Sequence, residues 1–320
     1  MPVCPVVGVV TERLTGLAAH VRPVFMLPVV GTSACGAVLA PTVDVWLAVQ
    51  HAVAVGTTLY VAHLRDGLVD GHVRGEEAPP LSVPEYRWAT ALAAGVALLL
   101  SASLTATVGV LAGGSVAVLL CLALLHAPYL DRHPIPVTVD YPVGIAVTLA
   151  GGFATQTGRL PAEVVAVAVS TAVLLAGIKV GIDRLDEAFD RSIGKRTVPV
   201  IAGASGARAV AVAGFAAAAL SVVAFVVSGV LPSLAALAAV AAICCGVATL
   251  ALPARTAVRV QMAMSYAFVA TLFVAVCAGE CAGWRVTARF VPLSAVRQVQ
   301  FDLVGRGPQL VEYLALAAFP

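Results

Sequence analysis

Two short segments carry most of the chemistry that this sequence could perform. In the first, Asp66 and Asp70 lie four residues apart, with His63 before them and Arg74 after them. If the preceding apolar helix continues through this segment, these side chains share one helical face. Two carboxylates one turn apart can bind a hard cation such as Mg²⁺, which prefers oxygen ligands and keeps phosphate oxygens in its shell. A solvated acidic loop is the alternative interpretation of this segment.

The second segment has a similar spacing of ionisable groups. Steps of four, three and four residues predict a stripe on one helical face that contains Lys179, Asp183, Asp186 and Asp190. Such groups at a membrane boundary often line a functional cavity, although a structural network of ion pairs is an alternative. Two acidic stripes on separate helices can bind two cations, and two cations can clamp a diphosphate between them.

Basic side chains near these acids could neutralise the remaining phosphate charge, which arginine does through two parallel hydrogen bonds. The candidates for contact with a diphosphate are Arg74, Arg132, Lys179, Lys195 and Arg196. For Lys179 we predict a catalytic contact that strengthens as negative charge grows on the diphosphate during bond cleavage. The alternative is that Lys179 extends to the membrane interface or pairs with Asp183.

The elements that must position these groups are membrane helices. Of the 320 residues, 60% are hydrophobic and 11% are charged, whereas soluble domains carry roughly 25% charged residues. This composition excludes a water-soluble globule, and the net charge of +2 argues against nucleic acid as a partner. Apolar windows long enough to cross a lipid bilayer predict nine spans, at residues 22–40, 43–64, 89–109, 113–130, 138–157, 161–182, 207–229, 232–252 and 258–282.

The charges of the loops predict how these spans are oriented. Nearly all loop arginines and lysines fall on the amino-terminal side, whereas the opposite interhelical loops contain only Arg159. Since basic residues favour cytoplasmic loops, we expect an integral protein of the cell membrane with its amino terminus and both acidic segments in the cytoplasm. Residues 1–21 form a cytoplasmic segment, residues 22–282 form the membrane domain, and the tail 283–320 is left unassigned.

The two segments resemble the aspartate-rich motifs of the UbiA superfamily of intramembrane prenyltransferases. The first match is Asp66-x-x-x-Asp70, after the second span. The second and more specific match is Asp183-x-x-Asp186-x-x-x-Asp190-Arg-Ser-Ile-Gly-Lys-Arg-Thr-Val-Pro-Val, after the sixth span. The resemblance covers roughly residues 15–282. It implies an all-α membrane protein of about nine helices around a central cavity, which transfers a prenyl group from a prenyl diphosphate to a lipophilic acceptor with Mg²⁺.

The resemblance also implies roles for individual residues. The expected Mg²⁺ ligands are Asp66, Asp70, Asp186 and Asp190, with Asp183 as an accessory acid. Arg74 occupies a position where the family often has a basic residue, which makes it a second candidate for a catalytic role. Ala62 stands where the first motif usually begins with Asn, so either His63 compensates or the chain is a divergent member, with a pattern that resembles archaeal ones.

Two other functions fit part of this pattern. A phosphatidyltransferase of the CDP-alcohol type also depends on acidic residues in the membrane. It needs its acids within one motif next to an Ala-Arg pair, which Arg65-Asp66-Gly67 lacks. A transporter that uses Lys179 and Asp183 as an ion site should place them near the bilayer midplane in interrupted spans, whereas here they fall at the predicted cytoplasmic boundary.

For a few residues outside the motifs, the sequence predicts a structural role. Asp140 is interpreted as the amino-terminal cap of the fifth span. The pairs Gly113-Gly114 and Gly151-Gly152 are interpreted as sites of close helix packing, because neither precedes a basic residue in a phosphate-loop pattern.

Overall fold

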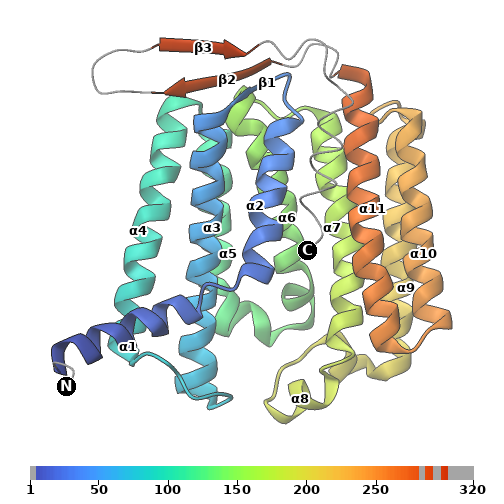
Figure 1. The fold of residues 1–320 in the computed structure, drawn as a ribbon. Helices are drawn as coiled ribbons and strands as arrows, with labels where there is room; N and C mark the ends of the chain where they lie inside the picture. Colours follow the sequence, from blue (N-terminus) through green and yellow to red (C-terminus); the bar gives the residue numbers. More distant parts are fainter. Residues whose placement is uncertain (1–4, 281–284, 291–296, 302–320) are drawn as a thin grey trace.

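The computed structural model describes residues 5–280, 285–290 and 297–301. Most of these residues form a bundle of long antiparallel helices (Figure 1). The long helices are α2 (Pro23–Val38), α3 (Val45–Leu68), α4 (Val83–Thr107), α5 (Val110–Tyr129), α6 (Pro134–Thr157), α7 (Ala162–Asp183), α9 (Val198–Val227), α10 (Leu237–Ala251) and α11 (Ala254–Glu280). The other elements are α1 (Pro5–Ala19), α8 (Glu187–Ser192), the helical turns η1 (Val69–Arg74), η2 (Leu130–Arg132) and η3 (Ser233–Ala236), and the strands β1 (Thr42–Asp44), β2 (Arg285–Phe290) and β3 (Arg297–Phe301).

The helices have the length and composition of membrane spans. In the described part of the chain, 8 helices are long and apolar enough to cross a membrane. The bent pair α1 and α2 supplies a ninth span if it is counted as one. Each predicted span corresponds to one long helix, and large apolar side chains such as Leu99 and Leu220 lie exposed on the outside of the bundle. The chain is therefore an integral membrane protein with the all-α architecture that its sequence predicts.

Small residues allow the helices to approach one another closely. A Cβ atom at Gly152 of α6 would lie 3.2 Å from the backbone nitrogen of Ala37 in α2, and one at Gly113 of α5 would lie 2.9 Å from that of Thr105 in α4. A Cβ atom at Gly151 would come within 2.7 Å of the His51 ring. The packing role predicted for these three glycines is confirmed, whereas Gly114 faces open space.

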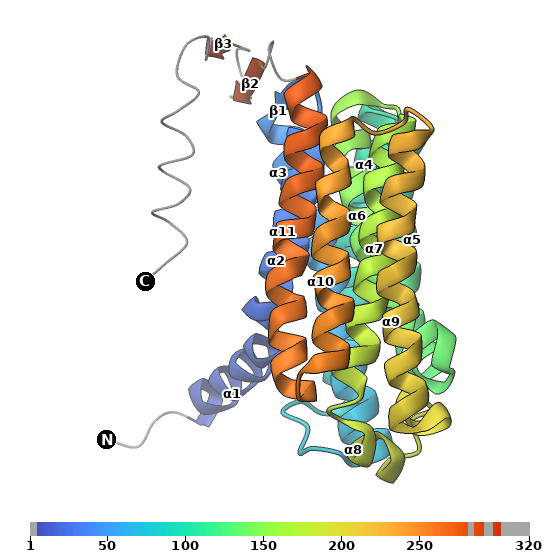
Figure 2. The ribbon, with the colours of Figure 1, turned by 90° about the vertical axis from the view of Figure 1, so that its right-hand side faces the viewer.

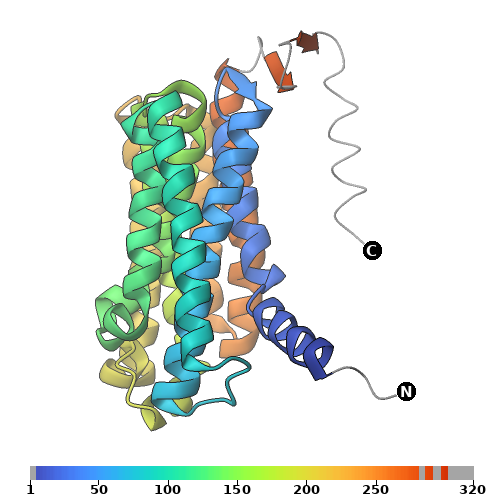
Figure 3. The same cartoon turned by 90° about the vertical axis from the view of Figure 1, so that its left-hand side faces the viewer.

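The two ends of the bundle carry different additions. At one end lie η1, η2 and α8, and α1 extends away from the bundle there, bent by 59° from α2 (Figures 1 and 3). We call this end the motif end. At the opposite end β1 pairs in parallel with β2, and β2 pairs antiparallel with β3 (Figures 1 and 2). The tail left unassigned thus contains two strands, and the segment before the first predicted span contains the helix α1, neither of which was predicted.

Candidate functional site

The first acidic segment lies on a continuation of α3 at the motif end. The helix does not stop at Leu68 but runs on as one turn of π-helix to Arg74, so the predicted continuation is confirmed. Asp66 and Asp70 are each partly buried, with side chains 24% exposed. His63 is buried instead against the link between α1 and α2, where its Nδ1 lies 3.1 Å from the carbonyl oxygen of His20.

Arg74 lies among three carboxylates rather than facing solvent. Its Nη1 donates to Oδ1 of Asp70 at 2.8 Å and lies 3.8 Å from Oε1 of Glu76, while its Nη2 pairs with Oδ2 of Asp131. Gly75 adopts a φ of 69°, a left-handed conformation that turns the chain so that Glu76 comes back beside Arg74. Burial raises the pKa of the Glu76 carboxyl. The guanidinium is therefore held inside the site by negative charge on several sides.

The connection between α5 and α6 contributes residues to which sequence reasoning gave no role in the site. Arg65 of α3 donates to the carbonyl oxygen of Ala127 at 3.0 Å, which fixes the end of α5 beside the first motif. There His126 pairs through Nδ1 with the buried carboxylate of Asp140, and its Nε2 lies 3.7 Å from Oδ1 of Asp66. Asp131 reaches Arg74 from the same connection.

Asp140 is not the cap that the sequence suggested. Helix α6 begins at Pro134, after His133 as its cap, so Asp140 lies inside the helix and points its carboxylate at His126. The cap interpretation was wrong because an acidic residue near the start of an apolar run looks the same in sequence whether it caps the helix or lies within its second turn. An unpaired aspartate inside a membrane span costs free energy, so its position alone could have indicated that Asp140 has a partner.

The second acidic segment is not one continuous helical stripe. Helix α7 ends at Asp183, a turn follows, and α8 begins at Glu187. The backbone nitrogens of Leu185 and Asp186 bond three residues back, to Ile182 and Asp183, which tightens and ends the helix. The predicted stripe is therefore wrong beyond Asp183. Asp186 is left exposed at the start of α8.

The remaining groups of this segment are held by local contacts. Lys179 pairs with Asp183, which is the pairing alternative considered for this lysine. Asp190 is buried, its Oδ2 accepts a hydrogen bond from Thr197 at 3.1 Å, and burial raises the pKa of its carboxyl. Arg132 and Arg196 are exposed and form no ion pair with any residue that the structure describes.

Lys195 links the two motifs electrostatically. It follows α8 in the chain, yet it lies within electrostatic reach of Asp66 and Glu76 of the first segment as well as Asp190 of the second. The two segments, four spans apart in sequence, therefore lie at the same end of the bundle (Figure 1), with Lys195 near both.

The donor set fits a divalent cation that also binds phosphate oxygens. Among the described residues, no three His, Cys, Asp or Glu side chains are close enough to hold a metal ion by themselves. However, Oδ1 of Asp66 and Oδ2 of Asp183 are buried and accept no hydrogen bond, which is costly for a charged oxygen. Mg²⁺ usually binds through one or two carboxylates and completes its shell with water and substrate phosphates.

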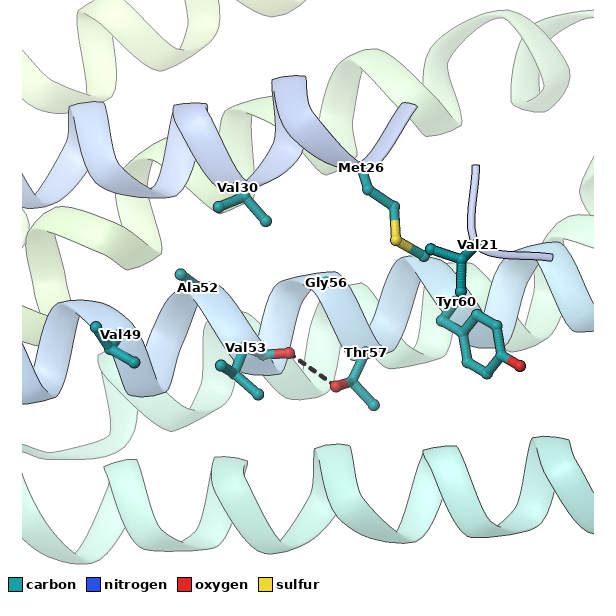
Figure 4. A pocket seen from close by; sticks show the side chains of 9 residues that line it. All are labelled: Val21, Met26, Val30, Val49, Ala52, Val53, Gly56, Thr57 and Tyr60. Carbon is teal, nitrogen blue, oxygen red and sulfur yellow. Dashed lines mark hydrogen bonds between the residues drawn. The ribbon is translucent and has the colours of Figure 1, made fainter. Parts of the chain in front are cut away.

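An apolar groove runs beside the first motif helix (Figure 4). It has a volume of about 400 Å³ and lies between α2 and α3, with Met26 and Val30 on one side and Val49, Val53 and Tyr60 on the other. Tyr60 lies at the end of the groove nearest the motif end. Its orientation is fixed because its hydroxyl donates to the carbonyl oxygen of Leu17 at 3.0 Å. This lining fits a hydrocarbon chain.

No protein-family model matches this sequence, and no curated protein sequence matches it either. Similar solved structures come from UbiA homologues. A UbiA homologue from Aeropyrum pernix K1 is 20% identical, with a TM-score of 0.60 over 79% of this chain and 98% of its own. A homologue from Archaeoglobus fulgidus, bound to GPP and Mg²⁺, is 14% identical, with a TM-score of 0.61 over 83% of this chain and 99% of its own.

A structure from work on digeranylgeranylglyceryl phosphate synthase in membranes is also similar. It is 14% identical, with a TM-score of 0.67 over 84% of this chain and 99% of its own. The similarity spans nearly the whole of each of these three structures. The membrane domain of this protein therefore has the UbiA fold.

Proposed function

We propose that this protein is a prenyltransferase of the UbiA type, which transfers a prenyl group from a prenyl diphosphate to a lipophilic acceptor within the membrane, with Mg²⁺. The observation that carries the proposal is that both acidic motifs lie at one end of an apolar bundle (Figure 1), where buried carboxylate oxygens accept no hydrogen bond. The fold supports it, because UbiA homologues from A. fulgidus were solved with Mg²⁺ and either GPP or DMAPP.

In this proposal Asp66, Asp70, Asp186 and Asp190 hold Mg²⁺, and Asp183 acts as an accessory acid. Bound Mg²⁺ would neutralise charge on the diphosphate and so favour its departure from the prenyl carbon.

The basic residues and the apolar helices do the rest of the work. Arg74 and Lys195, which already lie among the acidic side chains, bind diphosphate oxygens when the substrate enters. The exposed Arg132 and Arg196 attract the diphosphate to the entrance of the site. The surrounding helices exclude water from the electron-poor carbon until the acceptor attacks it, and no side chain needs to form a covalent bond.

The chemistry is tested by incubating the purified protein with prenyl diphosphates, Mg²⁺ and a panel of lipophilic acceptors. Mass spectrometry of the extracted lipids should find an acceptor heavier by one prenyl chain, and EDTA should remove this product. The product should return when Mg²⁺ is added in excess. Diphosphates that remain intact with every acceptor, or turnover that persists in EDTA, would contradict the proposal.

We further propose that the motif end faces the cytoplasm, in the cell membrane. Gly75 and Gly194 lie in loops at this end, but both have positive φ values, which would strain a cysteine. Ala78 and Ser192 are better positions for a cysteine label because they are exposed and have no positive φ. After replacement of the native cysteines, Ala78→Cys and Ser192→Cys should be protected from an impermeant thiol reagent in intact cells. Ser233→Cys at the opposite end should react, and the reverse pattern would invert the orientation.

A further inference from the structure

The α5–α6 connection brings a buried carboxylate into the acidic site from outside both motifs. Asp131, in η2, is only 3% exposed, and its Oδ2 pairs with Nη2 of Arg74. Its other oxygen, Oδ1, is buried and accepts no hydrogen bond within the described structure. Such a residue must act on the site through the arginine that it contacts, through its charge, or as a ligand.

The contact with Asp131 divides the guanidinium of Arg74 between two acids. Nη1 donates to Oδ1 of Asp70 at 2.8 Å, and Nη2 donates to Asp131. An arginine commonly binds a single carboxylate through two parallel hydrogen bonds, which occupy both carboxylate oxygens. Because Asp131 takes Nη2, Asp70 gives only Oδ1 to the arginine, and no described residue donates a hydrogen bond to its Oδ2.

We infer that Asp131 is a positioning residue, which binds Nη2 of Arg74 so that only Nη1 contacts Asp70. One oxygen of Asp70 thereby stays available to a divalent cation. The inference rests on the proposed function for the role of Asp70 and adds a third segment to the site. Without Asp131, Arg74 can turn both nitrogens onto Asp70 and compete with the cation. Residues that orient metal-binding groups in this way typically change metal affinity by roughly 10- to 100-fold.

A double-mutant cycle separates this role from the two alternatives. If Asp131 acts through Arg74, its replacement has no further effect once Arg74 is gone. If it is itself a ligand, or attracts the cation by its charge, the effect of its replacement persists without Arg74. Effects of two independent residues add, so the size of the coupling identifies the mechanism.

The measurement is Mn²⁺ binding to the purified full-length protein, followed by electron paramagnetic resonance of the free ion without any prenyl diphosphate. Asp131→Asn should weaken Mn²⁺ binding by roughly 10- to 100-fold, and Asp131→Glu, which keeps the charge, should restore most of it. In an Arg74→Gln background, Asp131→Asn should change the affinity by less than about twofold. Glu85→Gln is the matched control, because Glu85 pairs with Arg13 at 2.7 Å away from the motifs.

Each outcome decides the inference. The inference is overturned if Asp131→Asn binds Mn²⁺ as tightly as the wild type. It is also overturned if Asp131→Asn weakens Mn²⁺ binding equally in the wild-type and Arg74→Gln backgrounds. If Asp131→Asn alone does not fold, the double variant Arg74→Gln/Asp131→Asn is measured instead, because it removes both charges of the pair between Arg74 and Asp131. It should bind Mn²⁺ at least as tightly as the wild type, and binding weaker by more than about tenfold overturns the inference. Wild-type protein that binds no Mn²⁺ overturns the metal site of the proposed function as well, so the two failures are distinguishable.

Discussion

Asp66→Asn is expected to lower the rate of prenyl transfer by at least roughly 100-fold, the loss typical when one charge-stabilising group is removed from an active site. Asn keeps the shape of the side chain but loses the charge that a hard cation needs. The fold should survive, because the substitution removes a partly buried charge and leaves the pair between His126 and Asp140 in place. The measurement is kcat at saturating prenyl diphosphate, with thermal unfolding of the same preparation.

The result for Asp66 needs a control at the same end of the molecule. Glu85→Gln also removes a carboxylate there, but Glu85 belongs to the cap of α4 and contacts Ser82 and Arg13 rather than either motif. It should leave kcat unchanged. Asp190→Asn should resemble Asp66→Asn, although Asp190 is buried and also bonds Thr197, so its folding must be verified separately. Normal turnover in Asp66→Asn would exclude Asp66 as a required metal ligand.

Lys179→Met should depress kcat by at least about 10-fold while KM changes little. This pattern is expected of an interaction that strengthens as charge develops on the leaving diphosphate, whereas uniform binding affects KM alone. Methionine keeps the aliphatic length of lysine, so the substitution mainly removes the charge. The structure adds a second effect, because Lys179 pairs with Asp183, whose side chain is 6% exposed. Removing one partner of a buried pair can cost about 3–5 kcal/mol of stability.

The double variant Lys179→Met/Asp183→Asn separates these two effects. It leaves no unpaired carboxylate, so its stability should return towards that of the wild type. If Lys179 acts on the diphosphate, kcat of the double variant stays below that of Asp183→Asn alone. If Lys179 serves only to neutralise Asp183, kcat of the double variant equals that of Asp183→Asn alone, and the contact of Lys179 with the diphosphate is excluded. Steady-state kinetics and thermal unfolding of the wild type, the two single variants and the double variant give the answer.

Residues that interact along a helix, or with the surrounding solvent, could be predicted from the sequence. A span needs about 20 apolar residues in a row, so the helices could be located from hydropathy alone. Asp66 and Asp70 are one turn apart on any helix, and the continuation of α3 to Arg74 kept Asp70 and Arg74 in contact. The pairing of Lys179 with Asp183, also one turn apart, was foreseen as an alternative for the same reason.

Contacts between distant segments were decided by the tertiary structure. Arg74 pairs with Asp131, and His126 lies beside Asp66. The two residues of each pair are far apart in sequence, so no helical spacing predicts the contact. Both contacts depend on how the α5–α6 connection packs against the end of α3. The pairing of β1 with β2 joins residues near 43 to residues near 286. The break after Asp183 was missed because the spacing of the acids fits a helix, whereas the backbone there tightens into a turn. A helical pattern shows which residues can share a face, but only the packed chain determines where the helix ends and which buried charges meet.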